Sequence, residues 1–195
     1  MPDTPTPRCS ILVLAGGRGA RLHGVDKGLQ LWQGQPLISW LWRMARPLTD
    51  DLIISCNRNH DRYRTYADQL VSDDESDFPG PLAGIRTGLK VARHPRVVVL
   101  PCDSPLVDAS LVNALIDAAH SAPAMIRQGH QWQPLMCCIP TRLGQDLESA
   151  WQQGERSPLR WLLGHELIEV SCDQTDNRLA NFNTPDMFNR TSSGS

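Results

Sequence analysis

A pair of glycines followed by basic residues ends the first apolar run of the chain. Ile11–Leu14 has the composition of a buried strand, and Gly16 and Gly17 come directly after the next residue. Because glycine has no Cβ, main-chain N–H groups at these positions can approach phosphate oxygens closely. Arg21 and Lys27 follow and supply positive charge. The combination predicts a loop that binds a polyphosphate.

This loop differs from two common phosphate-binding patterns. No Gly-Lys-Ser/Thr sequence stands at the spacing of a Walker A loop. A dinucleotide fingerprint is incomplete, because Leu22 stands where a third glycine should follow Gly17 and Gly19. The simplest alternative is an ordinary strand-to-helix turn that happens to carry arginines.

A single acid at the end of a second apolar run is the next candidate. Val97–Leu100 is followed by Pro101, Cys102 and Asp103. A carboxylate at the carboxyl end of a buried strand is well placed to hold Mg²⁺, which takes oxygen ligands and completes its shell with water and phosphate. The other interpretation is that Asp103 caps the turn with its own side chain. The glycine loop favours the metal interpretation.

Together these segments resemble a known family of enzymes. The loop is similar to that of nucleotidyltransferases of the nucleotide-diphospho-sugar-transferase-like superfamily, and the Gly-Val-Asp-Lys-Gly string resembles the branch of MobA-like molybdenum cofactor guanylyltransferases. The segments that carry the resemblance are Leu14–Gly17, Gly24–Gly28, Asn57–Arg58, Pro79–Gly84, Cys102–Pro105 and Asn181–Pro185. The similarity extends from about residue 10 to residue 188.

The resemblance implies a reaction and a set of site residues. GMP would pass from GTP to the terminal phosphate of molybdenum-bearing molybdopterin, forming the guanine dinucleotide cofactor and pyrophosphate. Mg²⁺ would be the cofactor with Asp103 as its ligand, and the catalytic residues would be Arg21, Lys27 and Asp103. The nucleotide would contact Leu14, Ala15, Gly16, Gly17, Lys27, Ser55, Asp73 and Asp103. Transient contact with cofactor-insertion proteins or molybdoenzymes is a further expectation.

Two of the nucleotide positions leave room for another interpretation. The carboxylate of Asp73 could accept hydrogen bonds from both N1–H and N2–H of guanine, a donor pair that adenine lacks; alternatively, Asp73 belongs to a solvated acidic loop. At the position of Ser55 the family usually carries an asparagine, and a hydroxyl offers one donor rather than two.

Contacts with the second substrate are assigned to the later part of the chain. The resemblance places Asn181 and Asn183 near the acceptor or the metal, although a helix N-cap would equally explain Thr184. Trp132 is expected in a loop between two strands, where it is a candidate for contact with the pterin. The family's usual Pro-Thr pair is Pro134-Leu135 here, which leaves the pterin contacts open. The other tryptophans are expected in the core.

Three alternative hypotheses for the function remain. The enzyme could use CTP with the same pterin acceptor, or it could activate a sugar or lipid phosphate. A reading from a different class is a non-catalytic carrier of nucleotide or pterin, which would not need Asp103.

Composition excludes several classes of partner and location. The net charge of −2 leaves no basic footprint for nucleic acid, and no apolar run reaches the length of a membrane span. The six cysteines form no Cys-x-x-Cys pair, and several lie in apolar runs. Free cysteines and a reducing cytoplasm are therefore expected. In a strand, Cys137 and Cys138 would point to opposite faces.

Short apolar runs alternate with helical patterns, which predicts an α/β fold of three layers, with a mostly parallel, Rossmann-like sheet covered by helices on both faces. Ligands bind such sheets at the carboxyl ends of the strands. We expect strands at 10–14, 51–56, 70–71, 96–100, 124–127, 134–139 and 166–171, and helices at 37–46, 61–69, 82–92, 108–120, 142–152, 158–163 and from 185. One domain spans residues 10–190, between a disordered lead-in (1–9) and a flexible tail (191–195).

Overall fold

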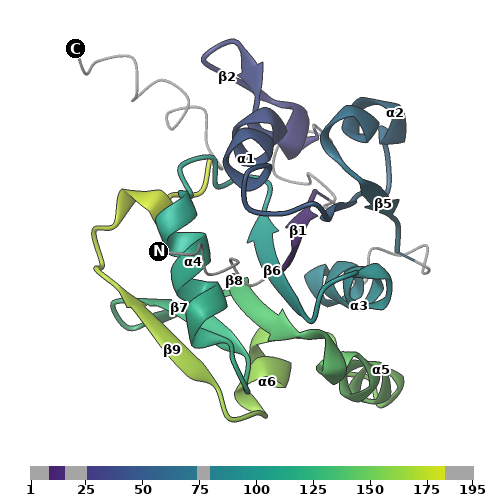
Figure 1. Cartoon of the computed structure of the whole chain (residues 1–195), viewed down its shortest axis with the longest axis vertical. Coiled ribbons are helices and arrows are strands. Elements are labelled where there is room, and N and C mark those ends of the chain that lie inside the picture. The colour runs from purple at the N-terminus through teal and green to yellow at the C-terminus, as the bar shows by residue number, and fades with distance from the viewer. Residues whose placement is uncertain (1–8, 16–25, 74–79, 183–195) are drawn as a thin grey trace, which may run out of the picture.

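The alternation of apolar runs with helices builds one twisted sheet flanked by helices (Figure 1). The computed structural model describes residues 9–15, 26–73 and 80–182. Within these residues the main sheet has seven strands in the order β5-β4-β1-β6-β8-β7-β9. The strands are β1 (Ser10–Leu14), β4 (Leu52–Ser55), β5 (Gln69–Val71), β6 (Arg96–Pro101), β7 (Ala124–Gln128), β8 (Gln131–Pro140) and β9 (Ile168–Cys172). A separate hairpin pairs β2 (Leu31–Trp32) with β3 (Gln35–Pro36).

Helices connect the strands and cover both faces of the sheet. They are α1 (Leu37–Ala45), α2 (His60–Tyr63), α3 (Pro81–Val91), α4 (Ala109–Ala118), α5 (Gly144–Gln152) and α6 (Pro158–Leu163). Short 3-10 turns lie at Lys27–Leu29, Arg64–Tyr66, Thr141–Leu143 and Asn177–Leu179. The side chain of Asp108 caps α4 by accepting a hydrogen bond from the Leu111 N–H at 2.9 Å, as the sequence predicts.

The two faces of the sheet bury separate apolar clusters. Ile11 and Val13 pack with α1 and α4, whereas Leu12 and Leu14 pack with α3, α5 and α6 on the opposite face. This division follows from the alternation of side chains along a strand. It gives the three layers predicted from the sequence (Figure 1).

Parallel pairing dominates the part of the sheet that holds the candidate site. β1 lies between β4 and β6 and is parallel to both, and β5 is parallel to β4. β8 runs antiparallel to β6 and β7, and β9 pairs in parallel with β7. The carboxyl ends of β1, β4, β5 and β6 therefore meet at one edge of the sheet.

Helix α3 approaches this sheet unusually closely at two glycines. A Cβ on Gly84 would lie 2.6 Å from Ser55 Oγ, and one on Gly88 would lie 2.5 Å from a methyl carbon of Leu12. Both distances are below normal contact, so only glycine lets the helix pack at this depth. The first turn of α3 is thereby held over the carboxyl ends of β1 and β4.

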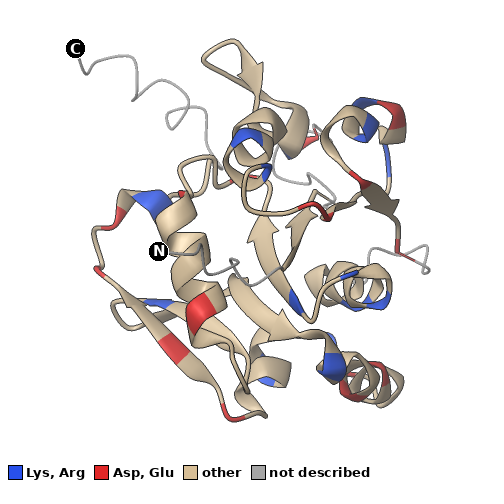
Figure 2. Ribbon diagram, viewed as in Figure 1, with Lys and Arg blue, Asp and Glu red and all other residues tan. Residues whose placement is uncertain are grey.

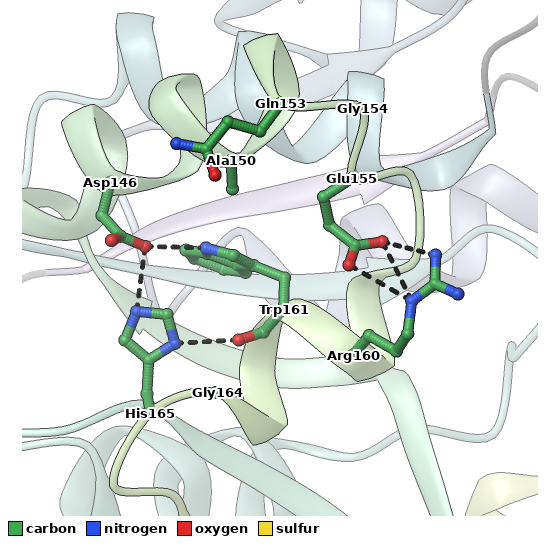
Figure 3. Close-up of a pocket in the computed structure, with 9 residues that line it drawn as sticks. All are labelled: Asp146, Ala150, Gln153, Gly154, Glu155, Arg160, Trp161, Gly164 and His165. Atoms are coloured by element: carbon green, nitrogen blue, oxygen red, sulfur yellow. Dashed lines mark hydrogen bonds and ion pairs between the residues drawn. The ribbon is translucent and has the colours of Figure 1, made fainter.

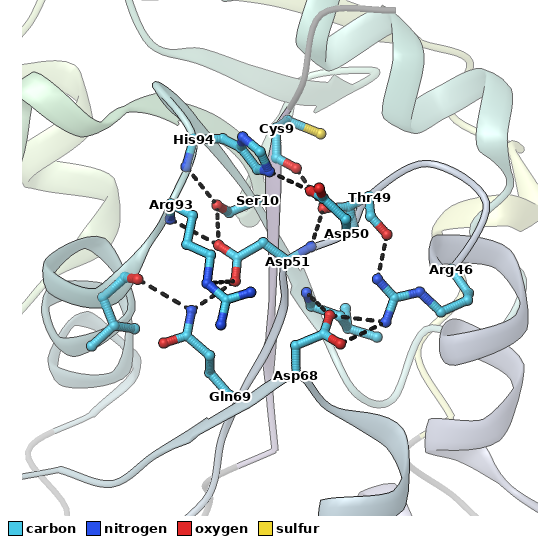
Figure 4. Close-up of polar contacts among 12 residues, drawn as sticks. Cys9, Ser10, Arg46, Thr49, Asp50, Asp51, Asp68, Gln69, Arg93 and His94 are labelled. Atoms are coloured by element: carbon cyan, nitrogen blue, oxygen red, sulfur yellow. Dashed lines mark hydrogen bonds and ion pairs between the residues drawn. The ribbon is translucent and has the colours of Figure 1, made fainter.

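The amino ends of the strands are joined by a buried carboxylate, Asp51 (Figure 4). Asp51 accepts hydrogen bonds from Ser10 Oγ at 2.5 Å, Gln69 Nε2 at 2.7 Å and the Arg93 N–H at 2.9 Å. Although burial opposes its ionisation, the hydrogen bonds from Ser10, Arg93 and Gln69 and the charge of Arg93 hold the pKa of Asp51 below its ordinary value. The network ties together β1, β4, β5 and the turn before β6, at the end of the sheet opposite the candidate site.

Charged residues are spread among the elements rather than gathered on one of them (Figure 2). Among the residues that the structure describes, no helix has the length and apolar character needed to cross a membrane. All six cysteines are free, and Cys137 and Cys138 belong to opposite apolar clusters, as predicted.

Four details differ from the sequence prediction. The helix predicted over 61–69 is a four-residue helix and a 3-10 turn, because Gln69 already pairs with Ile53 in the sheet. The β2–β3 hairpin was not predicted. Trp132 lies in β8, not in a loop, since β7 and β8 are joined at Gly129 and His130. Cys9, assigned to the disordered lead-in, is fully buried. The helix predicted from residue 185 lies outside the described residues.

Candidate active site

The carboxyl edge of the sheet brings together residues that are far apart in the sequence. Leu14 is in register with Ser55 on one side and with Pro101 on the other. Beyond the strands, the Ala15 N–H donates to the Ser55 carbonyl at 2.8 Å and the Cys102 N–H donates to the Leu14 carbonyl at 3.1 Å. These bonds fix the chain just before the predicted glycine loop and just before Asp103.

Lys27 and Asp103 form an ion pair at this edge. Lys27 Nζ lies 3.1 Å from Asp103 Oδ2, and the two side chains are 32% and 14% exposed. The pair is thus partly shielded but open to a ligand on one side. The sequence analysis named both residues, and the structure brings them together.

The turn that carries Asp103 is also held by a later segment. The Phe182 N–H donates to the Asp103 carbonyl at 2.7 Å, and Ser104 Oγ donates to Asn181 Oδ1 at 2.7 Å. The structure therefore places Asn181 beside the candidate metal ligand. The role that the resemblance implies for Asn181, near the acceptor or the metal, stays a prediction.

Asp73 is oriented by Asn57 across the ends of β4 and β5. Asn57 Nδ2 donates to Asp73 Oδ2 at 2.8 Å, and the Asp73 N–H donates to Asn57 Oδ1 at 2.9 Å. One of these hydrogen bonds holds the carboxylate and the other holds the main chain of Asp73, so the residue is fixed relative to the edge of the sheet. Ser55 lies deeper, since it is 3% exposed and packed beneath Gly84.

Asp26, immediately before Lys27, is enclosed by residues that sequence reasoning missed. Its Oδ1 accepts a hydrogen bond from the hydroxyl of Tyr63, and its Oδ2 accepts one from Asn59 Nδ2 at 2.9 Å. Arg58 Nε lies 3.9 Å from the same Oδ2. The motif around Asp26 and Lys27 was recognised, but nothing in the sequence pairs it with Tyr63 or Asn59.

Burial keeps the thiols and the phenol near the site in their neutral forms. Burial, together with the charge of Asp26, raises the pKa of Cys56 to about 11. Burial likewise raises the pKa of Cys102 and the pKa of Tyr63 well above their ordinary values. None of these groups is a nucleophile at neutral pH, and the Tyr63 hydroxyl is a hydrogen-bond donor.

The acid at the end of β6 suits a hard cation. In the described part of the chain, no three His, Cys, Asp or Glu side chains are arranged to hold a metal together. Asp103 alone nevertheless offers a carboxylate that already has a cation, the Lys27 ammonium, at 3.1 Å. One carboxylate is enough for Mg²⁺ when phosphate oxygens and water complete the shell.

Trp132 lies on β8, and its ring packs against Arg127 rather than standing in a loop. The Arg127 guanidinium carbon is 5.2 Å from the centre of the ring. Of the other tryptophans, Trp32, Trp151 and Trp161 are buried in apolar clusters, as predicted. The predicted site residues Gly16, Gly17, Arg21 and Asn183 lie outside the residues that the structure describes.

A concave surface between α5 and α6 is separate from this edge (Figure 3). Asp146 Oδ1 accepts a hydrogen bond from Trp161 Nε1 at 2.8 Å and lies 3.0 Å from His165 Nε2. Glu155 and Arg160 form an ion pair at 2.8 Å on its other side. The contact of Asp146 with Trp161 joins the two helices.

Comparisons with known proteins give a family match over most of the chain. The family described as MobA-like NTP transferase domain matches residues 11–168. The chain is 59% identical over 193 residues to a molybdenum cofactor guanylyltransferase from Pseudomonas paraeruginosa, covering 96% of each chain. It is 58% identical over 180 residues to one from Ectopseudomonas mendocina, covering 92% of this chain and 90% of the relative.

Solved structures show the same fold at low sequence identity. Molybdopterin-guanine dinucleotide biosynthesis protein A from Archaeoglobus fulgidus superposes with a TM-score of 0.75 at 23% identity, over 93% of this chain and 95% of the other. A 4-diphosphocytidyl-2C-methyl-D-erythritol synthase from Anaerococcus prevotii also gives 0.75 at 10% identity, over 95% and 94%. With the family match over most of its length, the chain belongs to the MobA-like NTP transferases.

Proposed function

We propose that the protein is a molybdenum cofactor guanylyltransferase that transfers GMP from GTP to the terminal phosphate of molybdenum-bearing molybdopterin. The products are molybdopterin guanine dinucleotide and pyrophosphate. The observation that carries this proposal is the 59% identity, over 96% of both chains, to a relative that bears this name. The pairing of Lys27 with Asp103 at the carboxyl edge supports a reaction on phosphates at that place.

The reaction needs positioning more than acid–base catalysis. An oxygen of the acceptor phosphate attacks the α-phosphorus of GTP, and a new P–O bond forms. The bond between the α-phosphorus and the bridging oxygen breaks, and its electron pair leaves with pyrophosphate. Because the attacking phosphate is already an anion, no side chain has to remove a proton from it. Alignment and neutralisation of charge then supply the catalysis.

The basic residues act on the leaving group. Lys27 donates to the phosphate oxygens and stabilises the charge that develops on pyrophosphate. Arg21, with the main-chain N–H groups of Gly16 and Gly17, has the same role for the β- and γ-phosphates in this proposal. The partial exposure of Lys27 supports it, because the ammonium can turn towards a ligand without leaving the edge.

Mg²⁺ is the cofactor that the donor set favours. Asp103 would hold it, and when bound it neutralises phosphate charge and polarises the α-phosphorus. Lys27 pairs with the same carboxylate, so this partly buried acid has a countercharge at the edge.

Recognition of the base falls to Asp73. Its carboxylate, held by the hydrogen bond from Asn57 Nδ2, accepts the N1–H and N2–H donors of guanine in this proposal. Leu14, Ala15 and Ser55 complete the nucleotide side. Asn181, Asn183 and Trp132 are the proposed residues of the acceptor side, and the contact of Asn181 with the turn of Asp103 supports the first of them.

The experiment that tests the proposal titrates the full-length protein with GTP, CTP and ATP, each with and without Mg²⁺, by calorimetry. Pyrophosphate release is then followed with molybdopterin as acceptor. We expect binding and turnover with GTP, and tighter binding when Mg²⁺ is present. Equal use of CTP would reject the guanylyl assignment, and nucleotide binding without pyrophosphate release would favour a non-catalytic carrier.

A further inference from the structure

The residues on both sides of Lys27 are held by one buried side chain, Tyr63. The Tyr63 hydroxyl donates a hydrogen bond to Asp26. On the other side of Lys27, a Cβ added to Gly28 would lie 2.5 Å from the same hydroxyl oxygen. The main chain at Gly28 therefore packs directly on the phenol, and no larger residue fits there.

Asp26 is buried and engaged by the residues around α2. Its side chain is 7% exposed, and both carboxylate oxygens are engaged by residues of α2 or of the turn before it. A buried carboxylate is costly unless it is paired and hydrogen-bonded. The contacts from Tyr63, Asn59 and Arg58 meet this requirement. Asp26 therefore has a structural role and does not contact the ligand in this arrangement.

Asn59 reaches Asp26 through an uncommon backbone conformation. Its φ is +56°, in the left-handed region, where asparagine is tolerated better than most residues. It stands at the N-cap of α2, yet its side chain does not cap that helix. The amide instead donates to Asp26 Oδ2 at 2.9 Å. The conformation at Asn59 thus serves the contact with Asp26.

We infer that Tyr63 and Asn59 are positioning residues for Lys27, which hold its main chain through Asp26 and Gly28 so that its ammonium stays within reach of Asp103 and the phosphates. The inference rests on the proposed role of Lys27 in nucleotidyl transfer. Neither residue touches the substrate in this arrangement. Their contribution is to keep a flexible four-carbon side chain on a fixed base.

The central test replaces Tyr63 by phenylalanine, which removes only the hydroxyl. Tyr66→Phe is the matched control, because it removes the other tyrosine hydroxyl of the chain from the neighbouring 3-10 turn. We expect Tyr63→Phe to lower kcat by roughly tenfold with little change in the KM for GTP, since a displaced Lys27 loses an interaction made in the transition state. Tyr66→Phe should leave both constants unchanged.

A double-mutant cycle separates positioning from general damage to the fold. In a Lys27→Ala background, adding Tyr63→Phe should cost less than twofold in kcat, because the residue being positioned is already gone. The full tenfold loss in both backgrounds would overturn the inference. Asn59→Gly is the second variant, as glycine keeps the positive φ while the amide is lost, and it tests the same prediction should Tyr63→Phe not fold.

A structural readout remains if the proposed reaction itself fails. Crystals of wild type and Tyr63→Phe, grown without ligand, give the Lys27 Nζ to Asp103 Oδ2 distance directly. The inference predicts that the 3.1 Å contact is lost or lengthened in the variant. An unchanged contact would reject positioning, whereas absent turnover of GTP by the wild type would reject only the proposed function.

Discussion

The ammonium nitrogen of Lys27 lies 3.1 Å from Oδ2 of Asp103, although 76 residues separate them in the chain. The contact joins the 3-10 turn Lys27–Leu29 to the turn that follows β6. It places a mobile cation and a fixed anion where a nucleotide triphosphate and its metal would meet.

Lys27→Ala should fold normally and lose most of its turnover. Removing a donor that stabilises transition-state charge costs roughly a hundred- to a thousandfold in kcat. Lys90→Ala is the control, because Lys90, the other lysine of the chain, pairs with Glu148 on the helices α3 and α5. Steady-state pyrophosphate release measures both variants. Turnover near the wild-type value in Lys27→Ala would contradict the assigned role.

Asp103→Asn should abolish the effect of Mg²⁺ on GTP binding. An amide is a weaker and uncharged ligand, so the variant should bind GTP with the same affinity with and without the metal. Calorimetric titration of GTP in both conditions measures this difference. Asp117→Asn, on an exposed position of α4, should keep the wild-type response. A metal effect that survives in Asp103→Asn would place the metal on other residues.

Asp73→Asn should weaken the choice of guanine. A carboxylate accepts both guanine donors, whereas an amide turns one acceptor into a donor. A hydrogen bond to a charged group is worth about 1.5–3 kcal/mol, so the ratio of kcat/KM for GTP over ATP should fall by about tenfold or more. Asp61→Asn, an exposed acid of α2, is the control. An unchanged ratio would move base recognition away from Asp73.

The two glycines of α3 should respond differently to alanine. Each added Cβ meets an atom at 2.5–2.6 Å, so both Gly84→Ala and Gly88→Ala should lower the free energy of unfolding. The crowding should cost about 1–3 kcal/mol, and the better helix propensity of alanine offsets part of this cost. Only Gly84→Ala pushes on Ser55 and Leu14, and it alone should raise the KM for GTP. Urea unfolding and steady-state kinetics separate the two effects; equal KM values would remove Ser55 from the nucleotide site.

Asp51→Ala should destabilise the protein in a pH-dependent way. Removing a buried carboxylate leaves the donors around it unpaired, at a cost of about 3 kcal/mol or more at pH 7. Because the folded-state pKa lies below the ordinary 3.8, this stabilisation is present above pH 4 and is lost as the pH falls through 3.8 towards the folded value. The difference from wild type in urea unfolding should therefore shrink below pH 4.

Asp50→Ala is the matched control for that measurement. Asp50 is the neighbouring acid, its side chain is 68% exposed, and it pairs with His94 at the surface. Its loss should cost about 1 kcal/mol or less. A constant difference between wild type and Asp51→Ala from pH 7 to pH 3 would show that the charge of Asp51 does not stabilise the fold.

The regular elements could be predicted because their patterns are local. Three valines in a row marked β6, and the Asp108 cap marked the start of α4. The β2–β3 hairpin was not predicted because each of its strands has only two residues. Trp32 of this hairpin packs against Trp40, which is in helix α1, and against Phe182, which is distant in the sequence. Trp132 was misplaced because the strand was predicted to begin at Pro134, whereas β8 begins at Gln131 and continues through Pro134 with a shift of register against β7.

The sequence could predict which segments contribute to the site, but not which residues of different segments are in contact. Lys27 and Asp103 were recognised separately from their motifs, but no sequence pattern states that they touch. The contact of Tyr63 with Asp26 spans 37 residues and comes from a four-residue helix, too short to give a periodic signal. Contacts of this kind depend on how the strands are ordered in space, which one sequence does not specify.

The attachment of Phe182 to the carbonyl of Asp103 has a practical consequence. Cys9 lies beside the amino end of β1, whereas Phe182 lies one hydrogen bond from the acid that would carry the metal. The fluorescence of a label on a cysteine engineered near Phe182 should therefore change when a ligand binds. A label placed near Cys9, at the opposite end of the sheet, should not respond and would serve as the control.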